Sequence, residues 1–406
     1  MVTNNEQNKL NVPHLRFPEF HGEWEKCKVS DLLDFYSTNS LSWDQLEYGT
    51  DNMLNLHYGL IHVGLPTMVD LSKDILPAIK KENEPKNFEL CKEGDIAFAD
   101  ASEDTNEVAK AIEFYTLEDK AVVCGLHTIH GRDKSNKTVV GYKGYAFSST
   151  AFHHQIRRIA QGTKIYSIST KNFAECYIGI PSKGEQTKIA KLLRLIDERI
   201  ATQSKLIEKL ESLIKGIVDC TILRKEKNAI IGDVCSISEQ IRAEANIDDI
   251  ITVRLHGNGV CKSSAENLQL GATQYYRRRA GQLIYGKQNF HNGAIGIVPI
   301  SLDNGITSKD IPSFDIDEIK CNSVYLLAQL QSPQYYKPAE ALTTGTGSKR
   351  LKEETFLKMP IVLPNKREQD NIAVLIHRAS MNLDHAKRLL ELLSIQKQFL
   401  LRQMFI

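Results

Sequence analysis

Apolar residues recur at steps of three and four in two long stretches of the chain, from about Glu185 to Leu223 and from about Arg367 to Gln403. This spacing is typical of amphipathic helices, and no proline interrupts either stretch. Each helix is expected to be on the order of 55 Å long, more than one globular domain needs, so we expect the two to pack side by side in a coiled-coil-like seam. The positions expected in the seam are Ile189, Leu192, Ile196, Leu206, Leu210, Leu213 and Ile217, then Ile372, Leu375, Leu389, Leu393 and Leu400.

The segment that leads into each long helix has the same pattern twice. An apolar strand ends at Pro181 and again at Pro364, and each proline is followed four residues later by a Glu-Gln pair, at a constant offset of 183 residues. A polar loop with a glycine, a hydroxyl and a cation precedes both strands. We therefore interpret the chain as a tandem duplication. The expected segments are an N-terminal arm at 1–20, globular domains at 21–183 and 224–366, and long helices at 184–223 and 367–406.

The globular domains show short apolar or alternating runs separated by turn residues. Strands are expected within 121–129, 292–300 and 323–329, and short helices or turns within 31–36 and 167–173. The predicted class is α/β or α+β, with two similar globular domains, two long helices and an internal pseudo-twofold repeat.

Composition excludes several classes of protein. The 51 Lys and Arg residues balance 50 Asp and Glu residues, so the protein is not one that binds a polyanion over its whole surface. A protein that binds nucleic acid at one specific site is still compatible with this balance. The first domain has more acidic than basic residues and the second has slightly more basic ones. Eight cysteines without any CxxC pair, no apolar leader and no membrane span indicate a reduced, cytoplasmic protein with no membrane partner.

Two possible catalytic or metal sites are weak. Gly281–Lys287 has the spacing of a phosphate-binding loop, but Gln288 follows where magnesium binding needs Ser or Thr. Cys124, His127 and His130 have the spacing of metal ligands, but the sequence offers no fourth ligand nearby. We therefore expect no catalytic residues, no metal and no cofactor on this chain.

Polar and basic segments suit contacts with double-stranded DNA, although each could also be a solvated turn. Side chains that can read guanine and adenine edges are Arg277, Arg278, Arg279, Lys287, Gln288 and Asn289. Candidates for holding phosphate oxygens are Thr163 and Lys164 in the first copy, and Ser348, Lys349 and Arg350 in the second. Lys134–Lys137 and Arg157-Arg158 are weaker candidates.

Taken together, these motifs resemble a known family. The opening Pro13–Trp24 segment, the repeated Gly-Ser/Thr-x-Lys/Arg loop, the repeated Ile-x-x-Pro with Glu-Gln and the two long helices are similar to the specificity subunits of type I restriction–modification systems. The resemblance implies two target recognition domains, each reading one half of a bipartite, asymmetric DNA site. It also implies that two antiparallel helices fix the gap between the half-sites.

The same resemblance implies partners and an absence of activity in the isolated chain. Two methyltransferase subunits would supply S-adenosylmethionine-dependent adenine methylation, and two motor-nuclease subunits would bring ATP and magnesium. Two alternatives come from other classes: a coiled-coil adaptor whose globular domains bind proteins, and an enzyme that uses the Gly281–Lys287 loop.

Overall fold

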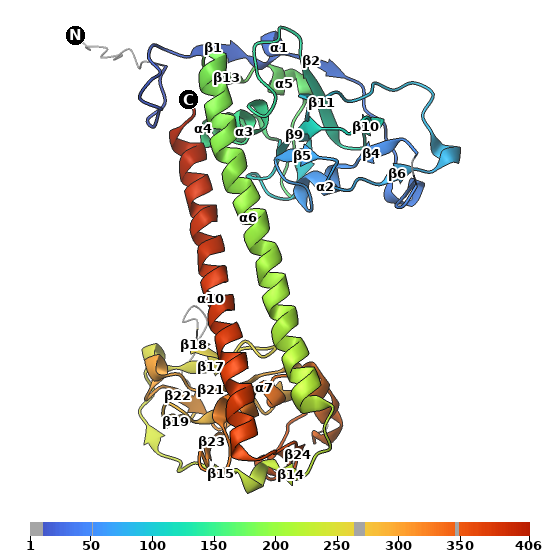
Figure 1. Ribbon diagram of the computed structural model, residues 1–406. Coiled ribbons are helices and arrows are strands. Elements are labelled where there is room, and N and C mark those ends of the chain that lie inside the picture. The colour runs from blue at the N-terminus through green and yellow to red at the C-terminus, as the bar shows by residue number, and fades with distance from the viewer. Residues whose placement is uncertain (1–10, 51, 264–272, 346–348) are drawn as a thin grey trace, which may run out of the picture. The chain divides into compact units, whose positions relative to one another are not determined.

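The computed structural model describes residues 11–50, 52–263, 273–345 and 349–406 (Figure 1). The chain divides into two compact units: Met1–Gln203 with Leu389–Ile406, called unit 1, and Ser204–Arg388, called unit 2. Both long helices, α6 (Lys183–Val218) and α10 (Lys366–Gln403), contribute residues to each unit. The expected class, a mixed α/β protein with a repeated globular part and two long helices, is confirmed.

Unit 1 is built around a five-stranded sheet of order β2-β11-β7-β9-β5, antiparallel except for the β5–β9 pair. These strands are β2 (Leu33–Tyr36), β11 (Thr128–Asp133), β7 (Ile96–Ala99), β9 (Ala111–Thr116) and β5 (Met68–Asp70). A second sheet joins β10 (Val122–Cys124), β4 (Leu54–Leu56), β6 (Ala78–Ile79) and β3 (Leu46–Glu47), and two strand pairs join β1 (Glu25–Lys28) to β13 (Tyr177–Ile180) and β8 (Ala101–Ser102) to β12 (Tyr166–Ser167). The short helices are α1 (Val29–Leu32), α2 (Tyr58–His62), α3 (Lys143–Phe147), α4 (Thr150–Ile159) and α5 (Thr170–Ala174).

Unit 2 repeats the central part of this arrangement with shorter strands. Its main sheet has the order β15-β23-β20-β21, which corresponds to β2-β11-β7-β9. These strands are β15 (Cys235–Ile237), β23 (Ser313–Ile316), β20 (Leu283–Tyr285) and β21 (Ile295–Ile297). The other strands are β16 (Arg242–Ala243), β19 (Tyr275–Arg277), β22 (Ile306–Ser308), β17 (Ile251–Val253), β18 (Val260–Lys262), β14 (Ala229–Ile230) and β24 (Pro360–Ile361), and the helices are α7 (Ser323–Leu330), α8 (Pro333–Tyr336) and α9 (Glu353–Leu357).

The glutamine of the repeated Glu-Gln pair makes the same three side-chain hydrogen bonds in both units. The buried Gln186 side chain accepts from Val139 N and donates to the carbonyl oxygens of Lys137 and Pro181, at 2.9, 3.0 and 2.9 Å. The buried Gln369 side chain does the same with Asn322 N, Lys320 O and Pro364 O, at 2.9, 3.1 and 2.8 Å. Every partner is displaced by the same 183 residues, so the duplication extends to individual hydrogen bonds.

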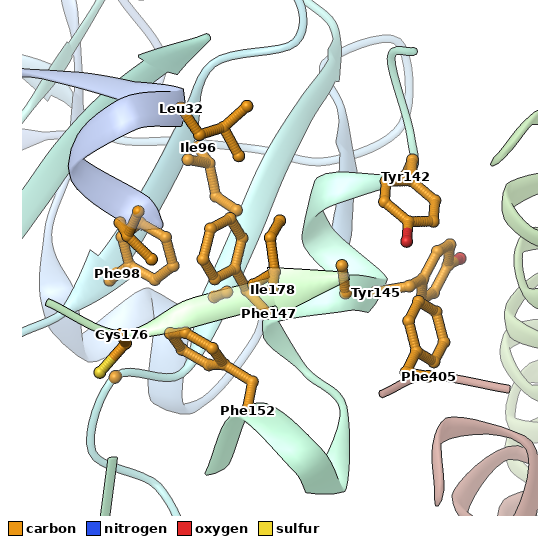
Figure 2. Packing of buried hydrophobic residues seen from close by; sticks show 14 of the residues in the cluster. Leu32, Ile96, Phe98, Tyr142, Tyr145, Phe147, Phe152, Cys176, Ile178 and Phe405 are labelled. Carbon is orange, nitrogen blue, oxygen red and sulfur yellow. The ribbon is translucent and has the colours of Figure 1, made fainter. Parts of the chain in front are cut away.

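Aromatic side chains fill the core of unit 1, as Figure 2 shows. Phe98 on β7 meets Phe147 on α3 edge to face, with ring centroids 5.0 Å apart, and Phe152 on α4 packs against Phe147 at 4.8 Å. The end of the chain joins this core, because Phe405 is buried beside Tyr142, with ring centroids 6.0 Å apart. Burial of these rings positions the strand ends and loops described below.

The helix seam is narrower than expected. Buried and half-buried positions on α6 alternate in steps of four and three from Ile189 through Leu193, Ile196 and Ile200 to Ile217, which is a heptad pattern. Of the expected seam residues, Ile189, Ile196, Ile372, Leu393 and Leu400 are buried, and Leu192, Leu210 and Ile217 are half-buried.

Four expected seam residues are exposed instead: Leu206, Leu213, Leu375 and Leu389 retain 43, 53, 52 and 38% of their accessible surface. A pair of helices covers only one stripe of each helix, and these leucines lie beside the stripe. On α10 the stripe includes the buried Ala379 and Ala386, which a search for large apolar residues overlooks. Ion pairs flank the seam, at 2.6 Å from Lys397 to Asp197 in unit 1 and at 2.8 Å from Lys387 to Glu211 in unit 2, and they require antiparallel helices.

Three other expectations need correction. The segment 31–36, expected to be a short helix or turn, is helical only to Leu32 and continues as strand β2. The first long helix is α-helical only to Val218, and Asp219–Leu223 forms a π-helical turn. The run at 323–329, expected to be a strand, is helix α7, because the Asn322 side chain accepts hydrogen bonds from the amides of Val324 and Tyr325 and so caps a helix start.

Candidate nucleic-acid interface

The polar loop ahead of each long helix is closed by a pair of backbone hydrogen bonds in both units, and each loop closed in this way is called a hairpin below. Gln161 and Ser167 exchange two backbone hydrogen bonds, of 2.9 and 2.8 Å, and Thr344 and Arg350 exchange a corresponding pair of 3.0 and 2.9 Å. The second residue of each hairpin is a glycine in the left-handed region, with φ of 136° at Gly162 and 128° at Gly345. Both hairpins expose polar residues, and they are 183 residues apart.

In the sequence the repeated Gly-Ser/Thr-x-Lys/Arg motif is read from Gly162 and from Gly347, and the observed correspondence corrects that alignment. Gly162 matches Gly345, so Lys349 and Arg350 match Tyr166 and Ser167 and are not the counterparts of Lys164. Ser348, a proposed phosphate contact, lies outside the described residues.

The hairpin is held against the end of a central strand in the same way in each unit. Ile168 N donates to Asp100 O at 3.0 Å, just after β7, and Leu351 N donates to Lys287 O at 2.9 Å, just after β20. The sheet therefore presents the hairpin and the strand end together, on one site that occurs once in each copy of the repeat.

In unit 2 this site is rich in cations and amides. Lys287 N donates to Asp310 O at 2.9 Å, so residues 287–289, 309–310 and 349–352 form one surface, which we call the unit-2 patch. Gln288 and Asn289 are exposed on it, as are Lys309 and Lys352, which the sequence analysis missed because they are isolated cations in polar turns.

Several cations of the unit-2 patch have carboxylate neighbours. Lys287 is largely buried and pairs with Glu353 at 2.7 Å, whereas Arg350 and Lys349 pair with Asp310 and Glu340 at 3.3 Å on the exposed surface. Exposed pairs of this kind contribute little to stability, about 0 to 1 kcal/mol, so Lys349 and Arg350 can exchange their partners for a phosphate at small cost.

The arginine run at 277–279 lies at the opposite end of β20 from the unit-2 patch. Arg277 and Arg279 are exposed around a hollow that also contains Glu239, Asp315 and Glu318. Because these carboxylates repel phosphate groups, the hollow is less suitable for binding DNA than the three consecutive arginines of the sequence suggest.

The structure removes Arg278 from the expected contacts. Its side chain is fully buried, and its guanidinium donates to Thr307 Oγ1, Ser313 Oγ and Ile311 O at 2.7, 3.0 and 3.0 Å. Burial lowers the pKa of Arg278 to about 10, because its partners are neutral and no carboxylate offsets the desolvation of the charge. Alternation along β19 and the turn after it places Arg278 inside the unit and its two neighbours outside.

The corresponding site in unit 1 carries a different set of side chains. Thr163 and Lys164 are exposed at the tip of the hairpin. Beside them is a hollow of about 640 Å³ whose lining includes Glu103, Asp104, Glu107, Lys110, His127 and Ile165. Carboxylates outnumber cations there. Arg157 and Arg158 at the end of α4 are exposed just before the hairpin, whereas Lys134 and Lys137 lie at the other end of β11, bonded to Ser30 O and Glu25.

The two weak catalytic motifs are not assembled as such. Gly281 opens the turn before β20, and Leu283–Tyr285 is a fully buried strand, so the segment has no loop for a phosphate group. His127 is exposed and contacts Asp100 at 3.1 Å, away from Cys124 and His130.

Substituting Gly162 by alanine should open the unit-1 hairpin. A Cβ atom at this position would lie 1.9 Å from Ile165 O, and φ of 136° is itself unfavourable for alanine. We expect a cost of about 1 to 3 kcal/mol, and hence roughly 5- to 150-fold faster hydrogen exchange of the Gln161 and Ser167 amides. Gly216→Ala is the control, because α6 leaves open space there and alanine favours a helix. Unchanged exchange in Gly162→Ala would contradict the hairpin geometry.

Among the described residues, no helix combines the length and the apolar character that crossing a bilayer requires.

A repeated α/β domain, two long helices shared between the units and one exposed hairpin site in each copy define a two-domain protein assembled on paired helices. Residues 22–212 match the family model described as the type I restriction modification DNA specificity domain. Residues 22–212 therefore carry the specificity domain of type I restriction–modification systems.

Two solved structures share the fold over nearly the whole chain. The S subunit of a type I restriction–modification system from M. genitalium is similar with a TM-score of 0.62 and 14% identity, over 97% of this chain and 99% of that chain. A structure from a study of complex assembly and conformational transition of the type I R-M system has a TM-score of 0.52 and 12% identity, over 96% and 98%. A search of curated proteins finds no match.

Proposed function

We propose that this chain reads a bipartite, asymmetric site on double-stranded DNA, with the hairpin site of each unit contacting one half-site. The observation that carries this proposal is the occurrence of the same exposed hairpin, tied to the same strand end, in both copies of the repeat. A duplicated scaffold with two different sets of exposed side chains suits two different half-sites, because identical sets would read an inverted repeat.

The charges of the two sites support different modes of binding. The unit-2 patch offers Lys309, Lys349, Arg350 and Lys352 for phosphates, and Gln288 and Asn289 for base edges. Carboxylates surround the unit-1 site, so in this proposal the affinity for the first half-site depends on partner subunits that contribute cations of their own.

We further propose that the long helices hold two methyltransferase subunits, which would bind S-adenosylmethionine, and that two motor-nuclease subunits with ATP and magnesium join through them. In this proposal the chain itself is not catalytic. Support comes from an exposed apolar face on the unit-1 part of α10, where Leu389, Leu392, Ile395 and Phe399 retain 38, 62, 55 and 46% of their surface. An uncovered row of this kind suits a permanent protein partner.

Substituting both Leu392 and Ile395 by aspartate should prevent this assembly. Two central apolar contacts in an interface are worth about 2 kcal/mol or more each, so we expect the affinity for the methyltransferase subunit to fall on the order of 1,000-fold or more. Co-purification and sedimentation of the co-expressed subunits measure this loss. Ile75→Asp, at another exposed isoleucine of unit 1, is the matched control. Normal assembly of the double variant would exclude this face.

Mapping of methylated adenines tests the DNA-reading function. Cells that express the chain with its methyltransferase subunit should acquire methylation at one bipartite motif. In the Gln288→Ala/Asn289→Ala double variant we expect the half-site read by unit 2 to relax, with about 1 to 3 kcal/mol lost for each base contact, while the other half-site stays the same. Asn371→Ala, an exposed amide on α10, is the control. Absence of any methylated motif and of DNA binding by the assembled subunits would instead favour the coiled-coil adaptor.

A further inference from the structure

Three potential metal ligands converge in the interior of unit 1. Cys91 precedes β7, Cys124 ends β10 and His130 lies in β11, and one ligand atom from each lies within 4.8 Å of the others. All three side chains are buried, with 5, 2 and 0% of their surface exposed. They come from three separate segments, so only the folded unit brings them together.

The histidine has a free nitrogen and a fixed orientation. His130 Nε2 lies 2.8 Å from Asp95 Oδ2, whereas Nδ1 is completely buried and has no hydrogen-bond partner. Asp95 in turn accepts from Arg132 and from Lys92 N, which holds its carboxylate in place. A carboxylate that holds one nitrogen of a histidine while the other nitrogen binds a metal is the usual arrangement around protein-bound zinc. An unpaired buried nitrogen is otherwise costly.

The two sulfur atoms are at a separation that suits one ion. Cys91 Sγ and Cys124 Sγ are 3.6 Å apart. Two thiolates that each lie about 2.3 Å from a tetrahedral zinc ion are separated by about 3.8 Å. Soft sulfur ligands with an imidazole favour zinc over magnesium or calcium, which prefer oxygen.

The equivalent place in unit 2 holds a positive charge. His130 lies opposite Ala97 in the sheet, as Ser313 lies opposite Ile284, so Ser313 is the counterpart of His130. The turns that follow Cys91 and Arg278 also correspond, because each is closed by a hydrogen bond from a backbone amide to the side chain three residues later. The Asp95 side chain accepts from Lys92 N, and the Gln282 side chain accepts from Arg279 N. Arg278, the counterpart of Cys91, therefore places its guanidinium beside Ser313. Unit 2 therefore holds the positive charge of Arg278 at the position where unit 1 has its set of potential metal ligands.

We propose that Cys91, Cys124 and His130 bind a zinc ion that cross-links β10, β11 and the segment before β7 in unit 1. Binding would convert the two thiols to thiolates, release their two protons to solvent and leave one tetrahedral position for a water molecule or another donor. The ion would have a structural role, because all three ligands lie in the interior of the unit. This inference revises the expectation of no metal, which considered Cys124, His127 and His130 and could not include Cys91.

The metal content of the full chain, purified under reducing conditions without a metal-chelating tag, tests the proposal. Elemental analysis should find one zinc ion per chain in the native protein and in Cys176→Ser, a substitution at another buried cysteine of unit 1. Cys91→Ser, Cys124→Ser and His130→Gln should each lose the ion. Native protein with no more zinc than Cys124→Ser, before and after incubation with zinc, would overturn the proposal.

A second measurement needs no variant and so does not depend on the variants folding. Cobalt added to the metal-free native chain should produce the strong thiolate-to-metal absorption of a sulfur-ligated tetrahedral site, and zinc should abolish it. Removal of the ion by a chelator should break the cross-link between the strands, so Cys91 and Cys124 should be alkylated faster than in the zinc-bound chain, as mapped by mass spectrometry, while the rates at Cys27 and Cys176 stay the same. A cobalt complex without the thiolate absorption, or a disulfide between Cys91 and Cys124 in the freshly purified chain, would refute the site.

Discussion

Substitution of Gln186 by methionine should destabilise unit 1 by on the order of 3 to 5 kcal/mol, and Gln369→Met should destabilise unit 2 by a similar amount. Methionine matches glutamine in length but leaves three backbone groups without partners in each case, among them Val139 N and Asn322 N. An orphaned buried polar group costs about 1 to 3 kcal/mol. The shared set of three hydrogen bonds predicts that the two substitutions have nearly equal effects.

Thermal and denaturant unfolding of the full chain, followed by hydrogen exchange in each unit, measures both losses separately. Gln396→Met is the control, because that side chain is exposed on α10 and the same chemical change should be nearly neutral there. If Gln186→Met and Gln369→Met unfold like the native chain, the glutamines do not hold the globular parts to their helices.

Lengthening both long helices by one heptad should move methylation to a new DNA motif. Duplicating Asp197–Gln203 in α6 and Leu389–Ile395 in α10 preserves the alternation of four and three along each seam. Seven residues add about 10 Å of helix, which corresponds to about three base pairs. If the helices set the distance between half-sites, methylation at the original gap should be lost and should reappear with a gap about three base pairs longer.

Adenine mapping of cells that express the lengthened chain with its methyltransferase subunit measures this change. Both half-sites should keep their bases, because the insertion leaves the hairpin sites untouched. A control with four residues inserted in α6 alone shifts its seam out of register with α10 and should weaken the assembly. Methylation that persists at the original gap in the lengthened chain would show that the helices do not set the spacing.

The duplication was readable from the sequence because it depends on local order. The prolines, the Glu-Gln pairs and the apolar periodicity recur at a fixed offset. In the structure the two glutamines make identical hydrogen bonds, which explains why both copies have a glutamine at this position. Small seam residues were missed because alanine gives little hydrophobic signal. Ala379 and Ala386 are nevertheless buried in the folded chain.

The candidate sites were predicted less well, for reasons visible at single residues. A run of three arginines cannot reveal that Arg278 points inward, since this depends on pairing between β19 and β22. The register of the second hairpin was displaced by two residues because Gly345 and Gly347 are equally good glycines in sequence, and only the backbone bonds between Thr344 and Arg350 select the first.

By itself, the sequence determined that this protein is a duplicated α/β domain with two long helices and a motif set like that of type I specificity subunits, because periodicity and repetition are properties of neighbouring residues. Tertiary structure alone decided which polar side chains share a surface. It tied Lys287 to residues 309–310 and 349–352, buried Arg278, and brought Cys91 to Cys124 and His130. These groupings join residues far apart in the chain, so they exist only once the sheets have formed and excluded water from the interior.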